Sequence, residues 1–418
     1  MKILIYGINF WPEPTGTGKY TGEMAVWLAK RGHTVTAIAA PPHYPEWKVS
    51  PGYVRKKIFA EQHAGVQIYR VPCFVPNPDE LNALNRIRME TTFSMNALKV
   101  WSRILASRSR FDIVIAVSPP LQVSLYPLIY SRFRAVPWVL HVQDLQVDAA
   151  IRLGLLKGRF ARILYGIESY FLSRATRVST ITEAMRRRII KKGVPERNTW
   201  LFPNWSDISF VRPLSRENNF RRAVGVRDDE ILVMYAGNMG EKQGLELVLY
   251  AAERLKGEES IKFALIGSGA ARSRLERLAK ELRLSNVMFL PVQPWERLPE
   301  MLAAADIHLV VQRREAADLV MPSKLANILA AGRPSVVTAD PSTALYQVLA
   351  EYNAGLVTPP GDVEAFVHAI KRLSDDFELR KQMGQNARAY AERYLDKEKI
   401  LSGFEQRLVG LVKEARGG

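Results

Sequence analysis

Cysteine is almost absent from this sequence: Cys73 is the only one in 418 residues. One cysteine cannot form a disulfide within the chain, and so long a chain without cysteine pairs is typical of a reducing compartment, so we expect a cytoplasmic protein. The six histidines are scattered, which argues against a metal site made of histidine and cysteine. Because no run of about 18 residues is free of polar groups and proline, the sequence predicts no transmembrane helix.

Acidic residues are also scarce, with 42 Asp and Glu against 59 Lys and Arg and a formal net charge of +17. The basic excess is concentrated in residues 86–110 and 152–192, where it alternates with apolar residues at helical spacing. Such helices can lie on an anionic membrane, where each Lys or Arg contributes about 1 kcal/mol. The alternative is an ordinary solvated helix face. No nucleic-acid partner is expected, because the chain has no recognition-helix, zinc or RNA-binding signature.

Short apolar runs alternate with longer helical patterns, which predicts an α/β protein with parallel sheets. The length suits two domains of about 200 residues each. We expect a Rossmann-like domain at 1–205, a second at 206–385, and a C-terminal helix at 386–418 that packs back on the first domain. The expected strands are 2–7, 34–39, 66–71, 112–117, 137–142, 178–181 and 199–202, then 230–236, 261–266, 287–290, 306–311, 335–338 and 355–357.

Two loops of the first half have residue types that suit a ligand. Gly16 and Gly18 follow the first strand, and glycines let backbone amides approach a ligand closely. Their spacing fits neither the dinucleotide fingerprint nor the P-loop, because Gly22 comes one residue late and Tyr20 stands where Ser or Thr would hold magnesium. Asp144 follows the strand 137–142, at the edge where catalytic carboxylates gather in parallel sheets. A tight turn and a helix start would explain the same residues without a ligand.

The segment 321–334 predicts a short buried helix that begins near Ser323 and ends at a glycine and a proline. Lys324 adds positive charge to the first turn, where the helix dipole is already positive and backbone amides are free, so a bound diphosphate would explain it. The alternative is a crossover helix whose lysine only reaches solvent. Two glycine-rich loops, 235–244 and 263–269, precede this helix, and together the three segments outline a nucleotide-sized cleft.

These motifs resemble those of the retaining glycosyltransferases of family 4, over essentially the whole chain. The resemblance implies the GT-B architecture, in which two Rossmann-like domains face each other across a cleft. The matching segments are the Gly16/Gly18 loop, 203–207, the Gly237 loop, 266–269, 304–306 and 322–334. Within the family, residues 2–9, 18–24, 202–206 and 238–244 are similar to enzymes of colanic acid synthesis.

What the resemblance implies is a hexosyltransferase of exopolysaccharide synthesis. Its donor would be a nucleotide-sugar, with GDP-fucose as the best guess, and its acceptor a polyprenyl-diphosphate-linked saccharide. Neither a metal nor another cofactor is expected. The enzyme would lie peripherally on the cytoplasmic face of an anionic membrane.

The resemblance also implies site residues, with Lys324 and Asp144 as the catalytic pair. Lys324 would stabilise the departing diphosphate, and Asp144 would orient the acceptor or assist its deprotonation. The residues expected to bind the donor or line its cleft are Gly16, Gly18, Asn238, Lys242, Gln243, Gly267, Asp318, Ser323 and Asn327.

The chain departs from the family at several of these positions. Asn327 stands in place of the glutamate that grips the ribose, and Asp318 lies one residue from the position of its partner glutamate. Asn238 and Gln243 replace the usual Arg and Lys, so more of the diphosphate charge falls to Lys242 and Lys324.

Three other functions stay open at the level of the sequence. A related enzyme could use a UDP-sugar, or could act on the sugar nucleotide itself, as a GT-B epimerase or hydrolase does. The chain could also be a non-catalytic basic scaffold at the membrane surface.

Overall fold

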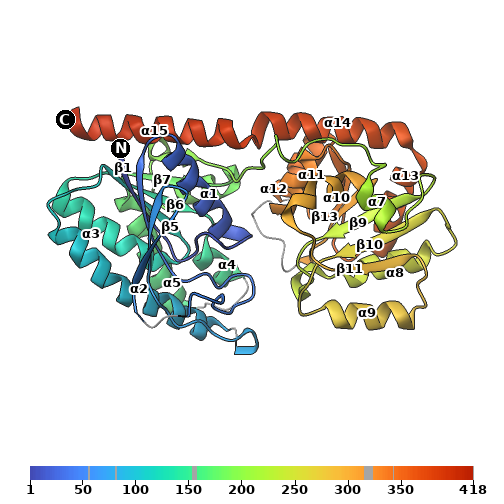
Figure 1. The fold of residues 1–418 in the computed structure, drawn as a ribbon, viewed down its shortest axis with the longest axis horizontal. Coiled ribbons are helices and arrows are strands. Elements are labelled where there is room, and N and C mark those ends of the chain that lie inside the picture. The colour runs from blue at the N-terminus through green and yellow to red at the C-terminus, as the bar shows by residue number, and fades with distance from the viewer. Residues whose placement is uncertain (55–56, 81, 153–157, 315–322, 342, 418) are drawn as a thin grey trace. The chain divides into compact units, whose positions relative to one another are not determined.

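The computed structural model describes residues 1–54, 57–80, 82–152, 158–314, 323–341 and 343–417. The chain divides into two compact units, Met1–Pro203 with Leu401–Gly418, and Asn204–Ile400. Each unit contains one sheet with helices on both of its faces (Figure 1). The predicted α/β class with two doubly wound sheets is therefore confirmed.

The sheet of the first unit has the strand order β3-β4-β2-β1-β5-β6-β7-β8. All neighbouring strands are parallel except β3 and β4, which are antiparallel. The strands are β1 (Lys2–Tyr6), β2 (Thr34–Ala39), β3 (Phe59–His63), β4 (Val66–Arg70), β5 (Ile113–Ser118), β6 (Trp138–Val142), β7 (Arg177–Thr180) and β8 (Thr199–Leu201). The central strands are buried on both faces, which is why they are continuous apolar runs.

The helices of the first unit connect these strands. They are α1 (Gly16–Lys30), α2 (Ala83–Ala106), α3 (Leu125–Arg134), α4 (Gln146–Arg152), α5 (Gly158–Arg174) and α6 (Glu183–Lys191), with short 3₁₀ helices at Pro78–Glu80, Leu121–Ser124 and Glu196–Asn198. Within the described ranges, none of the helices of the chain combines the length and the hydropathy that a bilayer crossing requires.

The sheet of the second unit has the order β11-β10-β9-β12-β13-β14, and every pair is parallel. The strands are β9 (Ile231–Ala236), β10 (Ile261–Ile266), β11 (Val287–Leu290), β12 (Ile307–Val310), β13 (Ser335–Thr338) and β14 (Gly355–Thr358). The helices are α7 (Asn219–Ala223), α8 (Glu246–Arg254), α9 (Arg272–Glu281), α10 (Leu298–Ala304), α11 (Ser323–Ala330), α12 (Ala344–Tyr352), α13 (Val363–Asp375) and α14 (Phe377–Tyr394), with 3₁₀ turns at Glu241–Gln243 and Trp295–Arg297.

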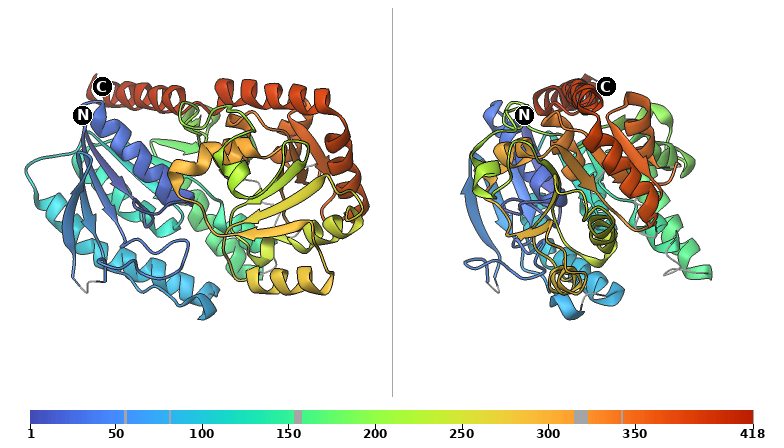
Figure 2. Two further views of the ribbon diagram at one scale, coloured as in Figure 1. Left: turned by 45° about the vertical axis from the view of Figure 1, so that its right-hand side comes forward. Right: turned by 90° about the vertical axis from the view of Figure 1, so that its right-hand side faces the viewer.

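Two apolar clusters form the core of this second unit, one on each face of the sheet. Figure 2 shows the helices of this unit on the two faces of its sheet. The first cluster contains buried residues of α10, α11, α12 and α14, and the second contains buried residues of α8, α9 and α13. Because both faces are covered, the ends of the parallel strands are the places left for polar chemistry.

In the structure, the C-terminal segment leaves the second unit after Ile400, whereas the expected boundary was at residue 386. Helix α14 buries Ala387 and Ala391 in the core of the second unit, so residues up to Ile400 belong there. Helix α15 (Lys397–Gly417) joins the first unit from Leu401 onward. There Phe404 stacks on Phe202 with ring centroids 3.8 Å apart.

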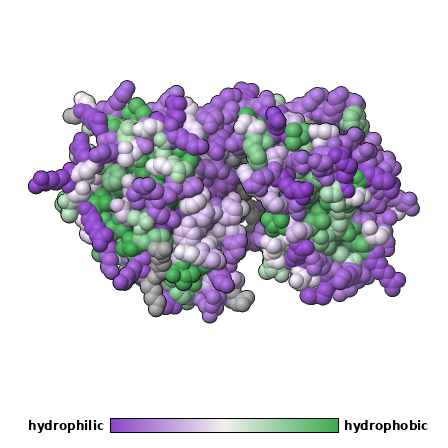
Figure 3. Space-filling model, viewed as in Figure 1, coloured by the Kyte–Doolittle hydropathy of each residue, from purple (hydrophilic) through white to green (hydrophobic). Residues whose placement is uncertain are grey.

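The two basic segments include most of helix α2 and all of helices α5 and α6 of the first unit. Apolar side chains of α2 and α5 remain exposed among the basic ones, and Met95 and Ile163 are 66% and 57% exposed. In Figure 3, apolar residues reach the surface of this unit in patches interrupted by hydrophilic residues.

Lys192 follows α6 and lies at the end of the predicted basic segment 152–192, but it does not belong to this basic surface. It is buried, and its Nζ lies 2.6 Å from Glu168 Oε2 and 2.8 Å from Asp148 Oδ2. The ammonium also lies over the ring of Tyr165, 3.7 Å from its centroid. Lys192 therefore ties α4, α5 and the end of α6 together, because a buried ammonium needs such partners.

Candidate functional site

In the second unit, the loops after β9 and β10 pack backbone against backbone. Gly237 and Gly267 have φ values of 149° and 148°, which favour glycine. A Cβ atom on Gly267 would lie 1.9 Å from the carbonyl oxygen of Gly237, so no side chain fits there. The two loops thus present main-chain groups, rather than side chains, at the carboxyl edge of the sheet. Gly267, one of the residues predicted to bind the donor, therefore allows the close contact between the two loops.

Lys324 reaches the same edge from the first turn of α11. Its Nζ donates a hydrogen bond of 2.8 Å to the hydroxyl of Tyr235, and lies 4.1 Å from the centroid of that ring. A Cβ atom on Gly237 would be 3.1 Å from this Nζ, so the ammonium lies directly against the glycine backbone. The hydroxyl of Tyr235 in turn donates to the carbonyl of Asn238, at 2.6 Å. Lysine, tyrosine and loop therefore form one connected group.

Among the residues that the structure describes, no carboxylate forms an ion pair with this ammonium. Loss of water around the ammonium lowers the pKa of Lys324 to about 7. Burial raises the pKa of Tyr235, so its hydroxyl stays neutral and cannot act as a counter-ion. A cation held without a counter-ion at the start of a helix is suited to bind an anion, since the helix dipole and the free amides act in the same direction.

The predicted diphosphate residues Asn238, Lys242 and Gln243 lie in the loop that Tyr235 holds. Gln243 is occupied locally, because its Oε1 accepts the backbone N–H of Gly240 at 3.1 Å. Asn238 and Lys242 are exposed, and Lys242 has no ion pair in the described part of the chain. Lys242 can therefore reach an anion, whereas Gln243 shapes the turn.

Asn327 lies one helical turn after Lys324 in α11. Its Oδ1 accepts a hydrogen bond of 2.8 Å from the hydroxyl of Ser206, which is buried. The carboxamide nitrogen is the group that this contact leaves available as a donor. Ser206 therefore fixes the orientation of Asn327. Ser323 begins α11 in the structure, and Asp318 lies outside the described residues.

In the first unit, Glu13 organises the Gly16/Gly18 loop. Its buried carboxylate accepts hydrogen bonds from the side chain of Asn9 and from the backbone N–H groups of His43 and Tyr44. Burial raises the pKa of Glu13, and these hydrogen bonds and nearby His43 oppose the rise. A Cβ atom on Gly18 would lie 2.2 Å from Glu13 Oε2, so this glycine makes room for the carboxylate. Glu13 thus joins the loops that follow β1 and β2.

Asp144 is exposed and follows β6 at the carboxyl edge of the same sheet. Behind it, His141 is buried and hydrogen-bonded at both nitrogens, to Ser179 Oγ and to the side chain of Gln143. Burial lowers the pKa of His141 to about 3, so the ring is neutral at physiological pH. His141 is therefore part of the core, and Asp144 is the titratable group that this loop presents to solvent. Because β1, β5 and β6 are neighbours, Asp144 and the Gly16 loop share one edge.

Three of these residues, Tyr235, Ser206 and Glu13, could not be selected from the sequence alone. Tyr235 lies in a mainly apolar predicted strand, and Ser206 is one polar residue at the expected boundary between the two domains. Glu13 is one polar residue in the loop after the first strand. Their roles depend on contacts with residues 30 to 121 positions away, such as Glu13 with His43 and Ser206 with Asn327.

Two protein-family models match the chain. The model described as "Glycosyl transferase 4-like domain" matches residues 15–205, and the model described as "Glycosyl transferases group 1" matches residues 216–390. A protein of Escherichia coli (strain K12), named as a colanic acid biosynthesis glycosyl transferase, WcaI, is 39% identical over 411 residues. That alignment covers 97% of this chain and 98% of WcaI.

Solved structures resemble the fold over almost its full length. Sucrose-phosphate synthase from Thermosynechococcus elongatus matches with a TM-score of 0.74 and 17% identity, over 99% of both chains. Anabaena HepE in complex with UDP matches with a TM-score of 0.71 and 16% identity, over 98% of this chain and 100% of HepE. The predicted GT-B fold is thereby confirmed. The chain belongs to the glycosyltransferase family that combines a glycosyl transferase 4-like domain with a group 1 domain.

Proposed function

We propose that this glycosyltransferase moves a sugar, with retention, from a nucleotide-sugar to a polyprenyl-diphosphate-linked saccharide in exopolysaccharide synthesis. The best guess for the donor is GDP-fucose. The observation that carries the proposal is the ammonium of Lys324, held at the start of α11 against the Gly237 backbone with no carboxylate partner among the described residues. The similarity to WcaI supports an exopolysaccharide product.

In this proposal the second unit binds the donor. The diphosphate accepts hydrogen bonds from Lys324, from the free amides of α11 and from Lys242, and the side-chain nitrogen of Asn327 donates to the ribose. Asn238 and the glycine loops lie along the nucleotide, and Asp318 contacts a sugar hydroxyl. As the bond between the sugar and the diphosphate breaks, negative charge grows on the leaving oxygen, and Lys324 stabilises that charge.

The acceptor binds the first unit, near the loop of Gly16 and Gly18. Asp144 orients its hydroxyl or takes up its proton as the new bond forms on the face that the diphosphate leaves. Among the described residues, neither the Gly16/Gly18 loop nor the loop of Asp144 offers a serine or cysteine nucleophile paired with a base. This supports a front-face substitution without a covalent intermediate. No metal is needed, because lysine and helix amides meet the diphosphate charge. Activity should then survive treatment with EDTA.

The test of catalysis is Lys324→Ala, compared with Lys280→Ala on the exposed side of α9. The loss of one group that stabilises transition-state charge should lower turnover about 10²-fold to 10³-fold. The Lys280 variant should keep wild-type turnover, and both should retain the wild-type melting temperature within a few degrees. Undiminished turnover in Lys324→Ala would remove the central claim.

The donor is tested by a thermal-shift screen of GDP, UDP, ADP and their sugar conjugates. A ligand at 100 times its dissociation constant stabilises by about 2.7 kcal/mol. Stabilisation by GDP and GDP-fucose supports the proposed donor, and a response to UDP alone replaces it with a UDP-sugar. Products formed without acceptor would indicate an epimerase or hydrolase, and no response at all would favour a scaffold.

Membrane association belongs to the same proposal, because a polyprenyl acceptor is embedded in a bilayer. Helices α2 and α5 carry exposed apolar residues beside Arg and Lys, the combination that an anionic lipid surface attracts. We expect the protein to bind phosphatidylglycerol vesicles but not pure phosphatidylcholine vesicles, and to release them at high salt. Met95→Ser with Ile163→Ser should weaken binding, whereas Tyr250→Ser, an exposed aromatic residue of α8, should not. Equal binding by all three proteins would exclude these helices.

A further inference from the structure

The second unit has a cavity of about 440 Å³ that the donor site does not use. It lies at the amino ends of β12 and β13, since Asp306 directly precedes β12 and Arg333 and Pro334 directly precede β13. The glycine loops and Lys324 lie at the carboxyl edge of the same sheet. The cavity and the donor site are therefore on opposite edges.

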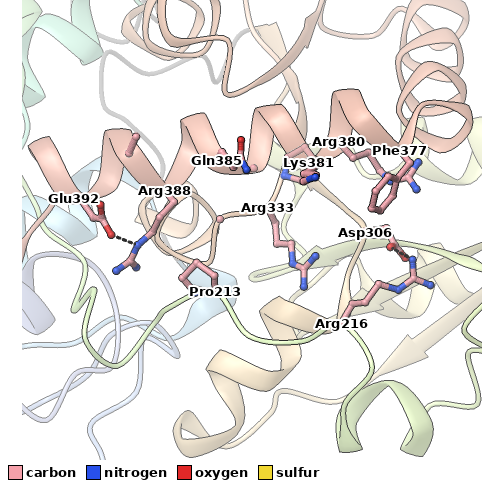
Figure 4. A pocket seen from close by; sticks show the side chains of 14 residues that line it. Pro213, Arg216, Asp306, Arg333, Phe377, Arg380, Lys381, Gln385, Arg388 and Glu392 are labelled. Atoms are coloured by element: carbon pink, nitrogen blue, oxygen red, sulfur yellow. Dashed lines mark hydrogen bonds and ion pairs between the residues drawn. The ribbon is translucent and has the colours of Figure 1, made fainter.

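Basic side chains dominate the lining of this cavity. In Figure 4, Arg380, Lys381 and Gln385 extend from α14, while Arg216 and Arg333 reach in from the loops below. Five basic residues line the cavity, namely Arg216, Arg333, Arg380, Lys381 and Arg388, against two acidic ones, Asp306 and Glu392. The lining thus has a surplus of three positive charges.

The two carboxylates are already engaged by arginines. Asp306 accepts from Arg216 at 2.8 Å and from Arg221 at 3.0 Å, and also from the backbone N–H of Leu232. Glu392 accepts from Arg388 at 2.7 Å. Within the described part of the chain, the remaining cations of the lining have no carboxylate of their own, apart from an exposed pair between Lys381 and Glu378 at 3.8 Å.

Arg333 is the least satisfied of these cations. Its Nη2 donates to the carbonyl of Leu214 at 3.0 Å, but its Nε is buried without a partner. The Nε of Arg216 is also buried without a partner. Burial and the neighbouring Arg216 and Arg221 lower the pKa of Arg333, while Asp306 opposes them. A buried guanidinium with unused N–H groups among like charges would be stabilised by an added anion.

We propose that this cavity binds a small molecule that carries a phosphate group, as a phosphate monoester. The guanidinium of Arg333 and the unpaired Nε of Arg216 offer N–H donors to phosphate oxygens, and the exposed Lys381 adds a further positive charge. The volume falls within the range of about 300 to 1,000 Å³ of small-molecule sites, so it holds more than a phosphate alone. Pro213 and Phe377 offer apolar surface for the organic part.

The cavity is built rigidly enough to keep such a site. Helix α14 approaches the turn after α11 so closely that a Cβ atom on Gly384 would lie 2.4 Å from the carbonyl of Gly332. Arg388 fixes this approach by donating to the carbonyls of Ala330 and Val211. The arginines therefore project from a tightly packed frame.

The test is calorimetric titration of the full chain with inorganic phosphate, glucose 1-phosphate and glucose. We expect both phosphates to bind, glucose 1-phosphate more tightly, and glucose not to bind. Arg333→Gln should weaken binding about tenfold or more. Because Arg333 is buried and its loss could disturb the fold, Lys381→Glu serves as a second variant at an exposed position and should also weaken binding. Arg277→Gln, an exposed arginine of α9 outside the cavity, should bind as the wild type does.

Two further measurements separate this cavity from the donor site. Lys324→Ala should retain phosphate binding, and saturating nucleoside diphosphate should not displace glucose 1-phosphate. If Lys324→Ala loses the phosphate and Lys381→Glu keeps it, the phosphate binds at the donor site and the proposal fails. If neither phosphate binds the wild-type chain, the arginines are purely structural and the proposal fails as well. Neither outcome depends on glycosyltransferase turnover.

Discussion

Burial lowers the pKa of Lys324 to about 7, because it destabilises the charged ammonium. An anion bound beside the ammonium would stabilise the charged form again. Tyr235 is the group that faces it, by hydroxyl and by ring, and the neutral hydroxyl contributes no charge. A diphosphate beside the ammonium raises its pKa, so binding above pH 7 takes up a proton. Below pH 7 the lysine is already charged, and affinity should not depend on its titration.

The dissociation constant of the nucleoside diphosphate should therefore rise between pH 7 and pH 9, by at most about tenfold per pH unit. Calorimetry in buffers of different ionisation enthalpy would measure the proton uptake directly. Lys324→Met should bind more weakly and without this pH dependence. The same slope in Lys324→Met and wild type would assign the effect to another group.

Replacement of Gly18 tests whether the buried carboxylate of Glu13 stabilises the first unit. A Cβ atom there would meet Glu13 Oε2 at 2.2 Å and Glu13 Cβ at 2.7 Å, so the side chain that holds two loops must move. We expect Gly18→Ala to destabilise the first unit by about 1–3 kcal/mol. Gly166→Ala in α5 is the matched control, because nothing lies within 4 Å of its Cβ position, and it should stabilise by about 0.5–1 kcal/mol. Native-state hydrogen exchange would measure both; equal effects would contradict the contact.

At the scale of elements, the sequence predicted the strands that are short, mainly apolar runs between helical patterns. The expected strands 34–39, 261–266, 287–290 and 335–338 agree with β2, β10, β11 and β13 residue for residue. Strand β3 was missed because Phe59–His63 is an edge strand with polar residues at Glu61, Gln62 and His63. Its pairing with β4 comes from a hairpin turn, and hydropathy does not reveal such a turn.

From the sequence, candidate site residues could be located only where they directly follow a predicted strand. Gly16, Asp144 and Gly267 could be assigned to strand ends, because loops after parallel strands share an edge of the sheet. Tyr235 and Ser206 were not, because their hydrogen bonds to Lys324 and Asn327 join segments that no local pattern connects.

The packing of α14 on α11 gives a prediction of its own. Gly384→Ala would place a methyl group 2.4 Å from the carbonyl of Gly332, and neither backbone can move without disturbing the core. We expect a loss of about 1–3 kcal/mol in the second unit. Gly410→Ala in α15, with nothing within 4 Å of its Cβ position, should instead stabilise its helix by about 0.5–1 kcal/mol. Exchange protection in α11 and α15 would distinguish the two, and an unaffected α11 in Gly384→Ala would contradict the close approach.

At the scale of the whole molecule, the first unit is completed by a segment from the far end of the chain. Residues from Leu401 onward pack on it, and Glu405 accepts a hydrogen bond of 2.8 Å from His33, whose sequence position is 372 residues away. Arg177 pairs with Glu414 in the same way, at 3.2 Å. The first unit therefore reaches its full stability only when the whole chain is present.

Phe404→Ala tests this dependence, because its ring stacks on Phe202 at 3.8 Å and is 2% exposed. Removal of a buried aromatic ring costs about 3–5 kcal/mol, and the loss should appear in the first unit, as faster hydrogen exchange in β7 and β8. The strands of the second unit should keep their protection, since Phe404 belongs to neither of its apolar clusters. Phe377→Ala, at an exposed phenylalanine of α14, should leave β7 and β8 unchanged. Equal deprotection of both sheets in Phe404→Ala would mean that the two units unfold as one, and that α15 stabilises the molecule as a whole rather than the first unit.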